Sequence, residues 1–118
     1  MGPLHGYRVL ELGSTAAGPF CTRLLADFGA SVVKIEPAEG DPIRNLGDHV
    51  GGKSLYAASI ARNKQIASID LRQPAGRDLL LRMLVHFDVV VENFRPGTLE
   101  RWGLSYETLC SVDRKSVV

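Results

Sequence analysis

The chain has 118 residues, 45% of them hydrophobic and 23% charged, and its net charge is +1. This length suits one hydrophobic core, so we treat residues 1–118 as a single domain. Basic and acidic residues are mixed along the chain, which argues against a nucleic-acid partner, and no stretch reaches the ~20 apolar residues that a membrane span needs.

The first third of the chain predicts two strands that flank a helix. Residues 7–12 predict the first strand, and the small residues 13–18 predict a turn. A helix can begin at Pro19, where the missing N–H is tolerated, and Gly29 suits its end. A second strand follows over residues 31–36. The apolar residues of the helix recur every three to four positions and give it one apolar face: Phe20, Leu24, Leu25 and Phe28.

The rest of the chain continues the alternation of strands and helices. Residues 37–53 contain several glycines and a second proline, and they predict a long loop of the kind that is often functional. The fourth strand carries three consecutive valines, a composition suited to burial on both faces. The remaining elements are expected in the order strand, helix, strand, helix and helix: 66–71, 74–86, 88–92, 96–102 and 106–112.

This alternation predicts an α/β fold, Rossmann-like, with a mostly parallel sheet and helices on both faces. Right-handed crossovers place the carboxyl ends of parallel strands at one edge of the sheet. We therefore expect a ligand site at that edge, where four loops meet: 13–18, 37–45, 70–73 and 93–97.

The turn from Gly13 to Gly18 opens a helix, and the unpaired N–H groups of a helix start suit a phosphate. Its spacing does not match the known phosphate-binding motifs. Thr15 replaces the middle glycine of G-x-G-x-x-G, and Pro19 stands where a P-loop has lysine. An ordinary strand-to-helix turn therefore remains the alternative.

Charged residues at the end of the second strand have two interpretations each. Glu36 either binds a ribose hydroxyl, as an acid does at this place in dinucleotide enzymes, or is a solvated strand-end carboxylate. Lys34 and Arg44 are expected to be surface charges, although either can meet a phosphate. No histidine or cysteine stands in metal-ligand spacing, so no metal is expected. Cys21 and Cys110 are expected to be buried as small hydrophobic residues, and such free cysteines favour a cytoplasmic protein.

The loop after the fourth strand has candidates for nucleotide recognition. Asn93 has a side chain that can read a heterocycle edge or fix a loop. Phe94 can stack on a base or fill the core. Arg95 and Arg101 can bind phosphate as planar forks, or they can lie solvated on the surface.

Several blocks, in order along residues 3–112, resemble class III CoA-transferases, the family of the formyl-CoA and carnitine CoA-transferases. The most specific block is Asp88-Val-Val-Val-Glu-Asn-Phe-Arg-Pro-Gly97. Leu25-Ala-Asp-Phe-Gly-Ala30 with Val32-Val-Lys-Ile-Glu-Pro37 is another, and Gly40-Asp-Pro42 with Arg44 fits too.

This resemblance implies that the chain is the CoA-binding, Rossmann-like N-terminal part of an acyl-CoA:carboxylate CoA-transferase. It implies as substrates a CoA thioester and a carboxylic acid, and a homodimer for full-length members. Pro37 and Gln65 depart from basic residues found in some members, which weakens phosphate binding at those two places. The residues that match the family's CoA contacts are Thr15, Ala16, Ala17, Ile69, Asn93, Phe94, Arg101 and Trp102.

The resemblance implies no catalytic residue in this chain. In the family an aspartate attacks the thioester, but that residue follows a segment with no counterpart in residues 1–118. The fragment alone is therefore predicted to be inactive, with a sheet that is incomplete relative to the family. Two alternatives stay open, a fragment of an α-methylacyl-CoA racemase and a non-catalytic CoA-binding remnant. Half of an NAD-dependent dehydrogenase is a weaker idea, because G-x-G-x-x-G is absent.

Overall fold

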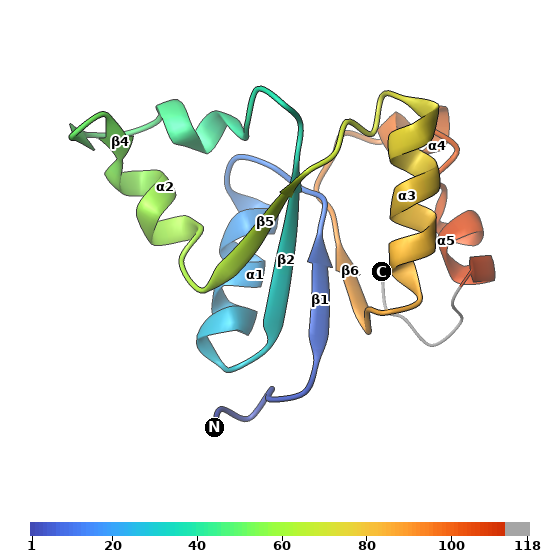
Figure 1. Ribbon diagram of the computed structural model, residues 1–118, viewed down its shortest axis with the longest axis horizontal. Helices are drawn as coiled ribbons and strands as arrows, with labels where there is room; N and C mark the ends of the chain where they lie inside the picture. The colour runs from blue at the N-terminus through green and yellow to red at the C-terminus, as the bar shows by residue number, and fades with distance from the viewer. Residues whose placement is uncertain (113–118) are drawn as a thin grey trace.

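The structure is a computed structural model that describes residues 1–112, so residues 113–118, where the family resemblance ends, lie outside the described residues. A parallel four-stranded sheet in the order β5-β2-β1-β6 forms its centre (Figure 1). Its strands are β1 (Arg8–Glu11), β2 (Ser31–Glu36), β5 (Lys64–Ser68) and β6 (Val89–Val91). The predicted α/β class is confirmed, and β5 begins two residues earlier than expected.

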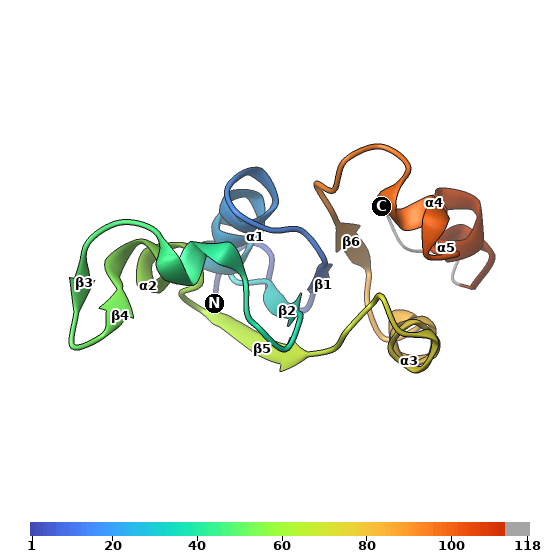
Figure 2. The ribbon, with the colours of Figure 1, turned by 90° about the horizontal axis from the view of Figure 1, so that it is seen from above.

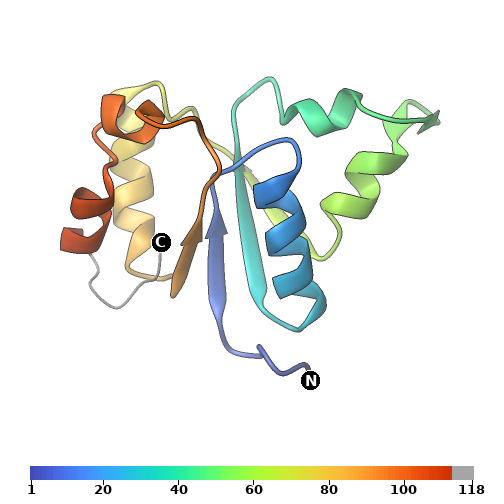
Figure 3. The same cartoon turned by 180° about the vertical axis from the view of Figure 1, so that it is seen from behind.

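Helices cover both faces of this sheet, as predicted. Figure 2 shows α1 (Ala17–Asp27) on one face and α3 (Pro74–Leu84) on the other, and Figure 3 shows α1 in front of β2. The short helices α4 (Thr98–Arg101) and α5 (Tyr106–Val112) lie beyond β6. None of the helices within residues 1–112 has the length and apolar character needed to cross a membrane.

The two faces of the sheet have separate cores because neighbouring strand residues point to opposite sides. On the α1 face, Val9 and its β2 partner Val32 pack with Ala26 and Ala30. On the α3 face, a larger cluster joins the sheet to α3, α4 and α5. Its fully or almost fully buried residues include Leu10, Val90, Leu80, Leu84, Leu104 and Leu109.

The prediction for the apolar face of α1 was wrong. Phe20, Leu24 and Phe28 are 47%, 40% and 55% exposed, and the helix instead buries Gly18, Pro19, Thr22 and Ala26 against the sheet. Thr22 turns inward because its hydroxyl donates to the buried carboxylate of Glu11, at 2.6 Å. Cys21 follows the outer face and is exposed, contrary to expectation, whereas Cys110 is half-buried.

The segment after β2 is more ordered than the predicted loop. It contains the 3-10 helix η1 (Pro42–Asn45) and a hairpin of β3 (His49–Val50) with β4 (Lys53–Ser54). The helix α2 (Leu55–Ile60) that follows was not predicted. Its sequence signal was Ser54, whose hydroxyl caps the helix by accepting the N–H of Ala57.

An exposed ion-pair cluster joins α1 to the segment after α2. The guanidinium of Arg62 donates to both oxygens of Asp27, at 3.2 and 2.6 Å, and Asn63 adds a further bond. Arg23 contacts the same carboxylate at 3.6 Å. The hydrogen bond from Arg62 is the main cause that holds the pKa of Asp27 below its ordinary value.

We expect Arg62→Gln to raise the pKa of Asp27 and to reduce stability above pH ~4, where the folded carboxylate is ionised. In the native protein this contribution is present above the unfolded pKa and is lost as the pH falls through the lower folded pKa. An NMR titration of the Asp27 carboxyl carbon measures the change. Arg23→Gln is the control and should raise this pKa less, and equal changes in both variants would contradict the assignment.

Candidate active-site pocket

The loops after β1 and β6 meet at the carboxyl edge of the sheet, as the sequence predicted. The amide of Asn93 joins them, because its Oδ1 accepts the backbone N–H of Ser14 at 2.8 Å and its Nδ2 donates to the Ser14 carbonyl at 2.9 Å. A side chain on Gly13 would collide with this amide, since its Cβ would lie 2.1 Å from the Asn93 Oδ1. Glycine at this position therefore allows the close approach of the two loops.

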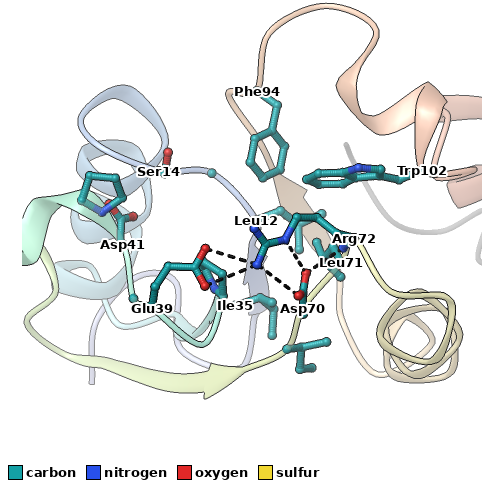
Figure 4. Close-up of a pocket in the computed structure, with 15 residues that line it drawn as sticks. Leu12, Ser14, Ile35, Glu39, Asp41, Asp70, Leu71, Arg72, Phe94 and Trp102 are labelled. Atoms are coloured by element: carbon teal, nitrogen blue, oxygen red, sulfur yellow. Dashed lines mark hydrogen bonds and ion pairs between the residues drawn. The ribbon is translucent and has the colours of Figure 1, made fainter.

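A pocket of about 250 Å³ opens at this edge (Figure 4). Its floor is apolar and includes Leu12, Ile35 and Leu71. Phe94 and Trp102 lie on one side, with ring centroids 5.5 Å apart and an interplanar angle of 73°. Its remaining lining comes from the loops after β1, β2 and β5: Gly13, Ser14, Pro37, Glu39, Gly40, Asp41, Pro42, Ile69, Asp70 and Arg72.

Arg72 is the cation that lines this pocket within the described part of the chain. Its Nε donates to Asp70 at 2.8 Å, and its Nη2 contacts Glu39 at 3.2 Å, as Figure 4 shows. Hydrogen bonds from the guanidinium and the backbone N–H of Arg72 hold the pKa of Asp70 below its ordinary value. The same contacts raise the pKa of Arg72. Both groups are therefore charged at neutral pH, and Arg72 is held over the pocket by two carboxylates.

A buried charge network of Glu11, Lys34, Asp41 and Lys64 lies beneath the pocket. The Lys34 ammonium contacts Asp41 Oδ2 at 2.7 Å, Glu11 Oε1 at 2.9 Å and the Gly13 carbonyl at 3.0 Å. The Lys64 ammonium contacts Glu11 Oε2 and the Pro19 carbonyl, both at 2.8 Å. All four side chains are at most 2% exposed where they pair. Two ammonium groups balance two carboxylates, as burial of charge requires.

This network corrects the expectation for Lys34, which is fully buried rather than a surface charge. Glu36 is not a solvated carboxylate either, because it is 4% exposed and pairs with Arg44 at 3.0 Å. Arg44 itself is half-exposed, as expected for a surface residue. These strand-end residues are drawn inward because η1 and α2 cover the segment after β2, and the sequence prediction lacked both elements.

The residues that the family resemblance selected fall into two groups in the structure. Ile69, Phe94 and Trp102 line the pocket. Asn93 joins its rim, as described above. The other residues lie outside the pocket lining: Thr15, Ala16, Ala17 and Arg101. Thr15 has a φ of 69°, and Arg101 is exposed and donates to the Thr98 hydroxyl at 3.4 Å.

Sequence reasoning did not single out Arg72. The available signal was its position in loop 70–73, one of the loops predicted to meet at the sheet edge. Glu39 and Asp41 also lie in such a loop, and their pairing depends on the tertiary structure. Within residues 1–112 there is no group of three or more His, Cys, Asp or Glu side chains arranged to hold a metal ion.

Known proteins match this chain over almost its whole length. It is 56% identical over 109 residues to the succinyl-CoA–D-citramalate CoA-transferase of Chloroflexus aurantiacus, covering 91% of this chain and 27% of that protein. It is 40% identical over 117 residues to the formyl-CoA:oxalate CoA-transferase of Afipia carboxidovorans, covering 98% and 28%. The chain thus spans about a quarter of the length of these relatives.

A solved structure supports the same relationship. The structure of a CAIB/BAIF family protein from Brucella suis matches 94% of this chain and 31% of its own, with a TM-score of 0.86 and 39% sequence identity. The sequence profile of CoA-transferase family III matches residues 4–118. The parallel sheet, the pocket at its carboxyl edge and these matches agree, and the chain belongs to CoA-transferase family III.

Proposed function

We propose that this chain supplies the CoA-binding part of an acyl-CoA:carboxylate CoA-transferase. One observation carries the proposal, namely a pocket at the sheet edge that combines the Arg72 guanidinium with apolar walls and two aromatic rings. CoA has matching parts, because its phosphates are anionic and its adenine is a flat aromatic ring. Arginine binds phosphate as a planar fork, and rings bind a base by stacking or edge contact.

The pocket volume indicates how much of CoA this chain encloses. Sites that enclose a drug-sized ligand have volumes of roughly 300–1,000 Å³, and this pocket has about 250 Å³. We therefore propose that the described residues hold only the ADP end, with the remainder lying along the open rim. There the exposed side chain of Arg101 and the small residues Ala16 and Ala17 offer contacts, as the family resemblance implies.

The carboxylates of the pocket have cation partners, so we assign none of them as a nucleophile. Asp41 pairs with Lys34, and Glu39 and Asp70 pair with Arg72. Transfer of CoA by covalent catalysis needs a carboxylate that can attack the thioester. We propose that residues 1–118 bind CoA without transferring it, and that a CoA thioester and a carboxylic acid are the substrates of the homodimeric whole protein. The relatives' names, both CoA-transferases, favour transfer over racemisation.

Calorimetric titration of the purified chain with CoA, 3′-phospho-ADP and pantetheine tests this proposal. We expect CoA and 3′-phospho-ADP to bind with similar affinity, because the pocket is proposed to hold the nucleotide end. Pantetheine should bind much more weakly, since it lacks both the phosphates and the base. No heat from CoA, or equal binding of pantetheine, would contradict the proposal. A parallel assay with succinyl-CoA and a carboxylic acid should detect no transfer by residues 1–118.

A further inference from the structure

The buried charge network contacts both walls of the pocket through one of its two lysines. The Lys34 ammonium binds the Gly13 carbonyl in the turn after β1 and the Asp41 carboxylate in the loop after β2. Gly13 and Asp41 both line the pocket. Lys34 does not line it, so any influence on a ligand must pass through these two neighbours.

Asp41 extends this link to the strained residue of the turn. Its Oδ1 accepts the backbone N–H of Thr15 at 3.1 Å and that of Ile43 at 3.0 Å. Thr15 has a φ of 69°, in the left-handed region that is unfavourable for a residue with a branched side chain. Such a conformation persists only where surrounding contacts hold it. The Asp41 carboxylate is one such contact, and the Tyr56 hydroxyl, 3.3 Å from the Thr15 carbonyl, is another.

We propose that Lys34 is a positioning residue for the pocket. By holding Asp41 and Gly13 together, it sets the turn at Thr15 and the loop after β2 in the arrangement that binds CoA, before the ligand arrives. The inference rests on the proposed function, because it takes the pocket as the CoA site. A preorganised wall improves affinity, since less ordering remains to be done when the ligand binds.

Lys64 provides an internal comparison for a purely structural role. It is as buried as Lys34, it pairs with the other oxygen of Glu11, and it also binds one backbone carbonyl, that of Pro19. Neither Glu11 nor Pro19 lines the pocket. A structural role predicts the same consequences for Lys34→Met and Lys64→Met, whereas a positioning role predicts a difference at the pocket.

The experiment compares Lys34→Met and Lys64→Met by amide hydrogen exchange and by CoA titration of the purified protein. Both variants should unfold more easily, because each leaves a buried carboxylate with one cation fewer. Lys34→Met should speed the exchange of the Thr15 and Ile43 amides and weaken CoA binding by about tenfold, because a loosened wall lowers affinity. Lys64→Met should leave both amides and the CoA affinity close to those of the wild type.

Asp41→Ala tests the same link from its other end and leaves Lys34 paired with Glu11, so the comparison stands even where Lys34→Met does not fold. It too should speed exchange at Thr15. Equal exchange at Thr15 in the wild type and Asp41→Ala, or equal effects of Lys34→Met and Lys64→Met on exchange, would overturn the inference. Absence of CoA binding by the wild type would instead refute the proposed function, while amide exchange would still decide whether Lys34 positions the turn.

Discussion

Replacing Arg72 by glutamine is expected to weaken CoA binding by about tenfold. A hydrogen bond to a charged group contributes about 1.5–3 kcal/mol, and each 1.4 kcal/mol corresponds to a factor of ten in affinity. We expect the lower end of that range, because the Arg72 side chain is 55% exposed and solvent screens its charge. Calorimetric titration with CoA at fixed ionic strength measures the effect. The affinity of Arg72→Gln should also depend less on salt, because one charged contact is gone.

Two further variants make this result specific. Arg82→Gln changes an exposed arginine at the other end of α3, away from the pocket lining, and should leave the affinity unchanged. Glu39→Gln should tighten CoA binding, because Glu39 pairs with Arg72 across the pocket and competes with a phosphate for it. Equal affinity of Arg72→Gln and the wild type would remove Arg72 from the proposed site.

Replacing Gly13 by alanine is expected to lower the free energy of unfolding by about 1–3 kcal/mol, the usual cost of overpacking a filled site. The new Cβ would lie 2.1 Å from the Asn93 Oδ1 and 3.2 Å from the Asn93 backbone nitrogen. The loops after β1 and β6 would have to separate, which would break the two hydrogen bonds between Asn93 and Ser14. Denaturant unfolding of the purified protein measures the change.

A double-mutant cycle tests whether this cost comes from Asn93. Asn93→Ala removes the colliding amide and its hydrogen bonds with Ser14. In Gly13→Ala/Asn93→Ala the collision with that amide is gone, so the loss of stability should be smaller than the sum of the two single losses. Additive losses would mean that the two loops do not meet in the way the structure describes.

The strands and most helices were predictable because their signals are local. Residues 31–36 form β2 as predicted, and α5 covers the predicted residues 106–112. The helix α2 was missed because it is short and its cap, Ser54, lies at the end of a glycine-rich loop. The buried face of α1 was wrong because side-chain hydrophobicity favoured Phe20 and Leu24, whereas the sheet required small residues and one hydroxyl facing Glu11.

By itself, the sequence determined the α/β class, the edge of the sheet at which loops meet, and the family resemblance. These follow from periodicity, from the handedness of strand crossovers and from short conserved-looking blocks, all of which are readable along the chain. Only the tertiary structure decided that Lys34 and Glu36 are buried, that Arg72 lies over the pocket between Glu39 and Asp70, and that Asn93 clasps Ser14. Contacts of this kind join residues far apart in the sequence, and whether a charge is buried depends on which other segments cover it.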